Sequence, residues 1–254
     1  MDFSFNAATF RDLFHNTVAP YLEGDELADV AMGEADKNSP QNLLAAMDQA
    51  IDVIARADAD AAVQQEMSAE SIGMLEEKDI STIGQYTLDI LEAMVAHIQE
   101  KTGEQNRELL RLSIPVSLWV ARRGGKLSQI DMPVNSLAAY ANEVSEPHAL
   151  EELAGIIREV IDACDDDIRR DLEQTNMMRP WRILNLNYGI VATRSHNPEL
   201  IEHAYDALIK NLPKDARQFF KEGMQQMDII GYPDEVRVVV ERYNQMWGSE
   251  SSLH

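Results

Sequence analysis

Apolar residues recur along this chain with the period of an α-helix. Residues 80–98 and 148–172 show the pattern most clearly, because apolar side chains three, four and seven positions apart fall on one side of each segment when it is helical. On the first segment this side carries Ile83, Thr87, Ile90, Leu91, Met94 and Ile98. On the second it carries Leu150, Leu153, Ile157, Val160, Ile161, Cys164, Ile168 and Leu172. Both segments are therefore predicted to be long amphipathic helices.

Prolines mark where many of the predicted helices begin. Seven of the nine prolines stand at a helix start, where the missing N–H is not needed and the fixed φ is already helical. Ser39 and Asn197 precede two of these prolines and are residue types that cap helices. The seven positions are Pro40, Pro133, Pro147, Pro180, Pro198, Pro213 and Pro233.

One segment has a rival interpretation as a strand. EVRVVVERY, residues 235–243, contains a run of β-branched residues, which are common in strands. Pro233, Asp234 and Glu235 nevertheless form a typical helix start, so we predict a helix. No two segments have the pattern of strands that could pair with each other. The sequence thus predicts an all-α chain of about eleven helices joined by short turns.

Charge is distributed unevenly over the 254 residues, whose formal net charge is −22. Residues 1–100 contain 20 acidic and four basic residues, a net charge of −16, and the rest of the chain carries −6. We therefore expect an acidic helical part over 1–101 and a repeat-like helical part over 102–254, packed together as one unit. The negative field disfavours nucleic acids and anionic membranes as partners. A solvated, solubilising face explains it better than a surface for a basic protein.

The C-terminal half is organised as pairs of helices. Predicted pairs begin at Pro180 and Pro213, 33 residues apart. In the first pair, Trp181, Leu184 and Tyr188 have the spacing of Trp-x2-Leu-Gly-x2-Tyr, with asparagine in place of the glycine. This segment resembles the opening of a tetratricopeptide repeat, over about 34 residues. The resemblance implies antiparallel helical hairpins that stack on one another.

Three cations and two glycines stand together in VARRGGKLS, residues 120–128. A phosphate-binding loop of the Walker type requires a further glycine five positions before its Gly-Lys pair and a preceding strand, and this stretch has neither. The preceding residues have a helical pattern. Arg122 and Arg123 fall in its last turn, and Gly124 or Gly125 supplies a left-handed cap. We interpret the stretch as the end of a helix.

The same predicted helix carries a proline and a row of basic residues. Pro115 removes a backbone hydrogen bond and is expected to kink the helix. Arg107, Arg111 and Arg122 fall within an arc of about 60°, and we expect this stripe to face the acidic N-terminal helices. The alternative is a site for an anion or a partner formed by Arg107, Arg111, Arg122, Arg123 and Lys126.

An aspartate-rich stretch, DACDDDIRRD over residues 162–171, resembles the Asp-Asp-x4-Asp motif with which all-α prenyl-diphosphate synthases hold magnesium. On a straight helix Asp165, Asp166 and Asp171 diverge and cannot meet on one ion. Pairing of the first two with arginines four positions later explains the charges locally. The alternative is a magnesium site formed by Asp162, Asp165 and Asp166.

Residues 179–199 contain the strongest candidate site. The helix predicted here is apolar on two sides, and Asn187 and Arg194 share the strip between those sides, with His196 just beyond the helix. A buried arginine requires a carboxylate or several other acceptors. One interpretation is therefore a structural ion pair that ties adjacent hairpins together. The other is a binding groove lined by Asn187, Arg194 and His196.

Little else in the sequence points to catalysis. We find none of the usual zinc, dinucleotide or serine-hydrolase motifs, and we expect no cofactor. One cysteine, an acidic start and charge-free runs too short to cross a bilayer favour a cytoplasmic protein. We predict a non-catalytic scaffold that binds another protein or peptide on stacked helices. The alternative is a magnesium-dependent all-α enzyme that acts on a diphosphate.

Overall fold

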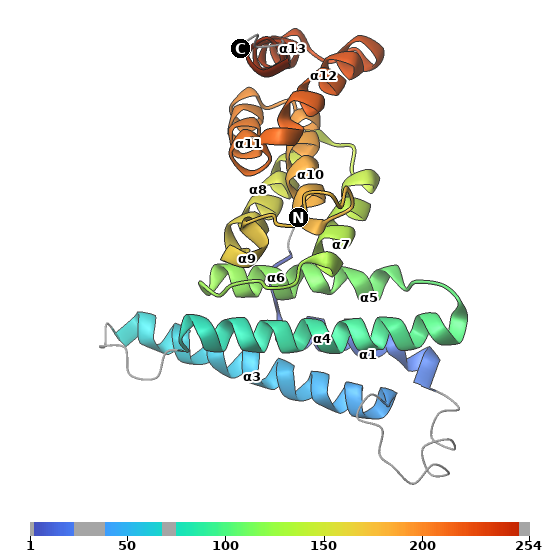
Figure 1. Cartoon of the computed structure of the whole chain (residues 1–254). Coiled ribbons are helices and arrows are strands. Elements are labelled where there is room, and N and C mark those ends of the chain that lie inside the picture. The colour runs from blue at the N-terminus through green and yellow to red at the C-terminus, as the bar shows by residue number, and fades with distance from the viewer. Residues whose placement is uncertain (1–2, 23–38, 68–74, 249–254) are drawn as a thin grey trace. The chain divides into compact units, whose positions relative to one another are not determined.

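A computed structural model of the chain describes residues 3–22, 39–67 and 75–248 (Figure 1). Over these ranges the regular structure is helical, and extended pairing is confined to an isolated bridge between Leu127 and Cys164. The prediction of an all-α chain with about eleven helices is confirmed for this part of the chain. None of its helices combines the length and the apolar character that a bilayer-spanning segment requires.

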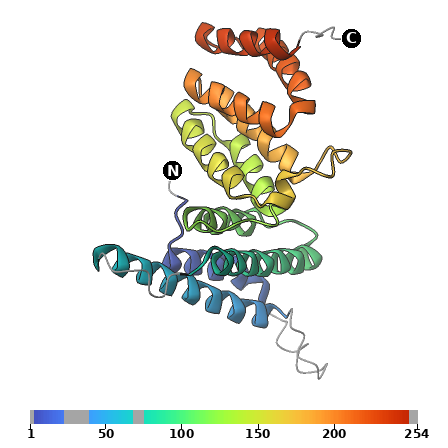
Figure 2. The same cartoon turned by 60° about the vertical axis from the view of Figure 1, so that its left-hand side comes forward.

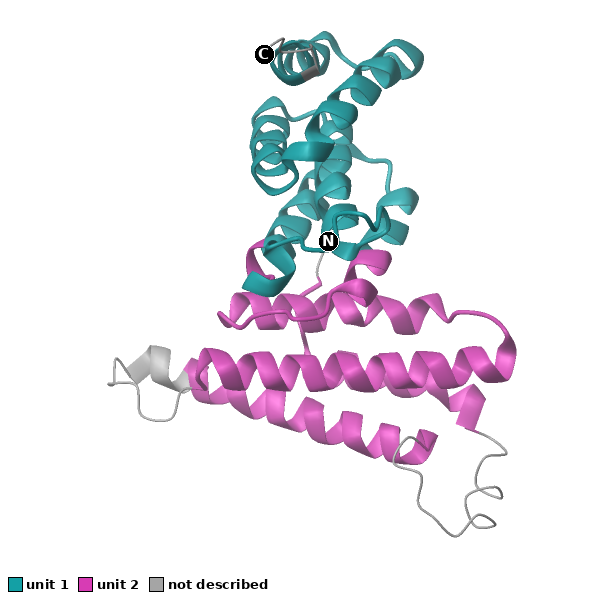
Figure 3. Cartoon of the chain, in the orientation of Figure 1, with its two compact units in different colours: residues 1, 137–161, 166–254 teal, residues 2–136, 162–165 magenta. Residues whose placement is uncertain are grey.

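The chain forms two compact units, which Figure 3 distinguishes by colour. Unit 1 comprises residues 137–161 and 166–254, and unit 2 comprises residues 2–136 and 162–165. The predicted boundary at 101/102 falls inside unit 2. That residues 102–254 do not fold by themselves stays a prediction.

Unit 2 is built on two long helices that run side by side, α3 and α4 (Figures 1 and 2). The shorter α1 packs against α3 and α5, while α6 packs on α4. Gly84 allows this last contact, because a Cβ there would lie 2.0 Å from a methyl carbon of Val120 on α6. The helices are α1 (Ala7–Leu22), α3 (Pro40–Met67), α4 (Glu77–Thr102), α5 (Arg107–Arg111), α6 (Ser113–Arg122) and the start of α7 (Asp131–Glu143).

The helix predicted around Pro115 is two helices. Proline has no N–H to donate to the carbonyl of Arg111, four residues earlier, and the chain breaks its helix at Leu112, between α5 and α6. The interpretation of VARRGGKLS as a helix end is confirmed, since α6 ends at Arg122 and Gly124 has a left-handed φ of 77°.

Unit 1 contains most of the helices that follow residue 137. Its hydrophobic core lies between α11, α12 and α13, where the rings of Tyr205, Phe220 and Tyr243 meet with centroids 5.0–5.5 Å apart. EVRVVVERY is helical, as predicted, within α13. The helices are α8 (Pro147–Ala163, whose last two residues belong to unit 2), α9 (Asp166–Arg169), α10 (Pro180–Arg194), α11 (Pro198–Asn211), α12 (Pro213–Ile230), α13 (Asp234–Tyr243) and a π-helical turn (Asn244–Gly248).

The continuous helix predicted over 148–172 is wrong beyond Ala163. The Leu127 N–H donates to the Ala163 carbonyl, and the Asp165 N–H donates to the Leu127 carbonyl, so these backbone groups bond outside the helix. Further along, Asp171 has a positive φ of 49° and Leu172 is 82% exposed. Apolar periodicity alone did not reveal this interruption, because the competing contact lies 36 residues earlier in the chain.

Candidate interaction surface

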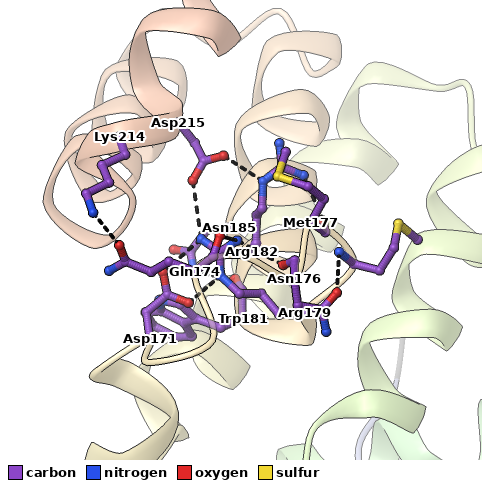
Figure 4. Close-up of polar contacts among 11 residues, drawn as sticks. Asp171, Gln174, Asn176, Met177, Arg179, Trp181, Arg182, Asn185, Lys214 and Asp215 are labelled. Carbon is purple, nitrogen blue, oxygen red and sulfur yellow. Dashed lines mark hydrogen bonds and ion pairs between the residues drawn. The ribbon is translucent and has the colours of Figure 1, made fainter.

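The segment between α9 and α10 is held by a buried arginine, Arg179, which is only 5% exposed (Figure 4). Its Nε and Nη2 both donate to the carboxylate of Asp171, and Nη2 also donates to Asp215 Oδ2 at 3.3 Å. Nη1 donates to the backbone carbonyls of Gln174 and Asn176, at 3.3 and 3.0 Å. These contacts use all five N–H groups of the guanidinium.

A second layer of contacts ties the same segment to α10 and α12. Arg182 donates from Nε to Asp215 Oδ1 at 2.6 Å and from Nη1 to the Met177 carbonyl at 3.1 Å. Lys214, near the start of α12, donates to Gln174 Oε1 at 2.6 Å. Residues 171–179, which we call the anchored loop, are thus fixed at several points along their length.

The electrostatics of Arg179 explain why the loop is stable in this conformation. The hydrogen bonds that Arg179 donates to Asp171 raise the pKa of Arg179, and the charge of Asp215 adds to the effect. A buried charge is tolerated only when its partners are well placed, and removing one partner of such a pair typically costs about 3–5 kcal/mol. The carboxylates and the guanidinium therefore hold the loop firmly.

The anchored loop presents apolar side chains to solvent. Leu172 is 82% exposed, Met178 is 73% exposed and Met177 is 55% exposed. Exposed apolar residues scattered singly are ordinary, whereas three within seven positions on a fixed loop are a candidate for a binding surface. Methionine is adaptable and polarisable, and it is common on binding surfaces.

Arg194, which sequence reasoning placed in the candidate groove, reaches backbone carbonyls. It donates to the carbonyls of Ala141 and Val144 at 2.7 and 2.6 Å. These carbonyls lie at the C-terminal end of α7, where the last turn of a helix leaves acceptors unsatisfied and the macrodipole favours a cation. The acceptors are therefore two backbone carbonyls and not the carboxylate of the structural ion pair, which was one of the two interpretations of Arg194. Arg194 caps another helix of its own chain.

The other two predicted groove residues have different surroundings. His196 has a left-handed φ of 60° just after α10, and its ring lies edge-on to Tyr232 with centroids 5.5 Å apart. Burial raises the pKa of Tyr232, and the nearby charge of Arg194 partly opposes that shift. Asn187 is half-buried on α10. The structure thus brings Arg194 and His196 together around Tyr232.

The predicted basic residues of α5, α6 and the following turn are spread over unit 2. Arg123 donates to Asp58 of α3 at 2.6 Å, and Arg122 donates to Ser4 Oγ at 3.1 Å. Arg111 lines a groove of about 390 Å³ with Glu108, the segment 3–6 and α1. Arg107 and Lys126 are exposed. Arg122 and Arg123 thus donate to side chains in the N-terminal part of their own chain.

The predicted aspartates of the magnesium alternative do not form a metal site. Within the described ranges, no three His, Cys, Asp or Glu side chains are grouped so as to hold a metal ion. Asp162 lies in the last turn of α8, Asp165 follows it, and Asp166 begins α9. Arg170 pairs with Asp167 at 2.8 Å, three positions away, rather than with the predicted Asp166.

Sequence reasoning missed the central role of Arg179. A signal was present, because Arg179 and Arg182 flank the start of a helix, where the macrodipole disfavours cations. Such placement implies carboxylates from elsewhere in the fold. Asp171 was hidden as a partner because the sequence predicted it inside a continuous helix.

Comparison of the chain with models of protein families, with curated proteins and with solved structures found no match. The case for function therefore rests on the geometry of this chain.

Proposed function

We propose that this protein is a non-catalytic interaction module that binds another protein through the anchored loop. The observation that carries the proposal is that the anchored loop combines exposed Leu172, Met177 and Met178 with the buried Arg179, whose hydrogen bonds hold the loop. Holding a loop in place before binding lowers the entropy lost on association. Apolar side chains on such a loop supply most of the contact energy.

The helix pairs of unit 1 support this proposal as a scaffold. α10 packs against α11, α12 packs against α13, and α11 contacts both later helices. Trp181, Leu184 and Tyr188 are all buried on α10, as in the tetratricopeptide pattern that they resemble. We therefore propose a repeat-like array of helical hairpins, whose usual role is to bind proteins or peptides rather than nucleic acid. Buried Cys164 suits the reducing cytoplasm in which we place the module.

A photo-crosslinking experiment tests the proposal. The full chain carries p-benzoylphenylalanine in place of Met178 and, as a matched control, in place of Val53, an exposed apolar residue of α3. In extract of the native cells, the residue 178 probe should yield a discrete crosslinked species that is absent for residue 53.

Replacement of the apolar surface gives the second arm of this test. Added as a competitor without the probe, the L172S/M177S/M178S chain should suppress the crosslink from residue 178 at least about tenfold less effectively than the wild-type chain does. Equal competition by both chains, or crosslinks of the same kind from residue 53, would show that the anchored loop is not the binding surface.

A further inference from the structure

We infer that one face of α12 binds an acidic peptide segment of another protein. Lys214, Arg217 and Lys221 are three and four positions apart, so they lie on the same side of the helix. All three are exposed. With Gln218 of α12 and Asn244 of the π-helical turn they line a groove of about 550 Å³, which we call the basic groove.

The basic groove is unusual in a chain with a net charge of −22, because the residues of its lining within 3–22, 39–67 and 75–248 include no acidic side chain. Two of the three carboxylates of α12 bind groups outside the groove, and the third accepts from Gln218, which lines it. Asp215 pairs with Arg182, Asp228 pairs with Arg237, and Glu222 accepts from Gln218 Nε2. The groove therefore presents positive charge and carboxamide groups.

The spacing of the three cations is unfavourable for the helix itself. Like charges three and four positions apart repel each other. Lys214 also lies in the first turn of α12, where the macrodipole disfavours a cation. It donates to Gln174, a neutral acceptor, which does not offset this repulsion. Residues that oppose local structural preference are expected at functional sites.

The spacing of the cations indicates the chemistry of the ligand. From Lys214 to Lys221 the helix rises about 10 Å, so the charges are spread along a line and do not converge as a single phosphate would require. Carboxylates distributed along an extended peptide can each meet one cation. Gln218 and Asn244 can donate to and accept from the backbone of that peptide. A long nucleic acid would extend beyond the groove into the negative field of the chain.

Fluorescence anisotropy with the full chain tests the inference. The probe is a short labelled peptide rich in Asp and Glu, and its Asn and Gln counterpart serves as the uncharged control, at about 0.15 M salt. K214Q/R217Q/K221Q should bind the acidic peptide about tenfold more weakly than the wild-type chain. R217Q/K221Q, which keeps the contact of Lys214 with the anchored loop, should also weaken binding. Circular dichroism establishes that both variants are folded.

A matched variant removes three exposed cations elsewhere. K78Q/R107Q/K126Q loses the same charge from unit 2 and should bind like the wild-type chain. The inference would be overturned if both triple variants bound the acidic peptide equally weakly, or if only K78Q/R107Q/K126Q lost binding. It would also be overturned if the wild-type chain bound the uncharged peptide as tightly as the acidic one. Binding of a single-stranded oligonucleotide in the groove as tightly as the acidic peptide would overturn the assignment of the ligand.

The groove and the proposed function fail in different ways. L172S/M177S/M178S leaves all three cations in place and should bind the acidic peptide normally. If this variant binds the acidic peptide normally and also suppresses the crosslink from residue 178 as well as the wild-type chain does, the inference for the basic groove is supported and the proposal for the anchored loop is wrong.

Discussion

Two arginines of unit 1 show how the same side chain stabilises a fold through different acceptors. Arg179 binds carboxylates and carbonyls in a buried network, whereas Arg194 binds the carbonyls at the end of α7. Both donate hydrogen bonds to acceptors that the rest of the fold leaves available, and a part-buried acceptor without a donor is costly. A planar guanidinium suits both tasks because its donors are fixed in a fork.

Replacement of Arg194 by methionine should destabilise unit 1. The variant keeps much of the apolar contact of the stem and removes two charge-assisted hydrogen bonds, so the free energy of unfolding should fall by about 2–4 kcal/mol. Urea denaturation measures the change, with the exposed Lys78→Met as control, expected to change by less than about 0.5 kcal/mol. A change below about 1 kcal/mol for Arg194→Met, together with loss of a bound protein, would make Arg194 a partner contact instead.

Tyr205 should make the fold sensitive to alkali. Burial raises the pKa of its phenol to about 12, although a hydrogen bond with Thr193 at 2.8 Å opposes the shift. Below pH about 10 the phenol is protonated in both the folded and the unfolded chain. Between pH about 10 and about 12 only the unfolded chain ionises, so this residue lowers stability by up to about 2–3 kcal/mol as the pH rises.

Urea denaturation from pH about 9 to about 11.5 measures this fall. Tyr205→Phe should show a shallower decline, and a decline should remain because the pKa values of Tyr232 and Tyr243 are also raised, first of all by burial. The same slope in Tyr205→Phe and the wild-type chain would assign the alkaline sensitivity to other groups.

At the scale of the helix, starts were predictable and interruptions were not. Pro40, Pro147, Pro180, Pro198 and Pro213 each begin a helix as predicted, because the preference of proline for this position is local. Of the other two predicted starts, Pro133 is the third residue of α7 and Pro233 precedes the first residue of α13. The break after Ala163 is different, since it depends on backbone bonds with a distant residue. A stripe of apolar residues continues through such a break without any local sign of it.

The candidate surfaces likewise combine features that are local in the sequence with features that depend on distant contacts. The apolar residues of the anchored loop were hidden because Leu172 continues the helical pattern of residues 148–172. The cations of α12 have helical spacing in the sequence, but the groove also requires Asn244, and only the packing of the π-helical turn against α12 brings it there. Arg194 was recognised as a residue that needs acceptors, while the identity of those acceptors depended on where α7 ends.

At the scale of the whole chain, several acidic side chains of residues 1–101 form ion pairs and hydrogen bonds within unit 2. Asp48 and Asp52 bind Arg11 of α1, and Asp58 accepts from Arg123 and from the indole of Trp119. These contacts tie α3 to α1 and to α6. The acidic helix α3 is therefore a structural partner as well as a solvated surface.

A fragment of residues 102–254 should not fold as a soluble monomer. It lacks α1, α3 and α4, so α5 and α6 lose the helices on which they pack. Ile114, Leu118 and Trp119 are buried in the full chain and would be exposed, which favours aggregation. Light scattering and dye binding, compared with the full chain, measure this outcome. A monomeric fragment with undiminished helix content would establish residues 102–254 as an autonomous domain.

The backbone bonds of Leu127 with Ala163 and Asp165 also set an order of events during synthesis. Chains fold from the N-terminus as they leave the ribosome. α1 to α6 emerge first, but Leu127 must leave its N–H and carbonyl to water until residue 165 has cleared the exit tunnel. Unit 2 is thus finished only after α7 and α8 have been made. A ribosome that stalls between these positions would carry an incomplete unit 2, exposed to chaperones and proteases.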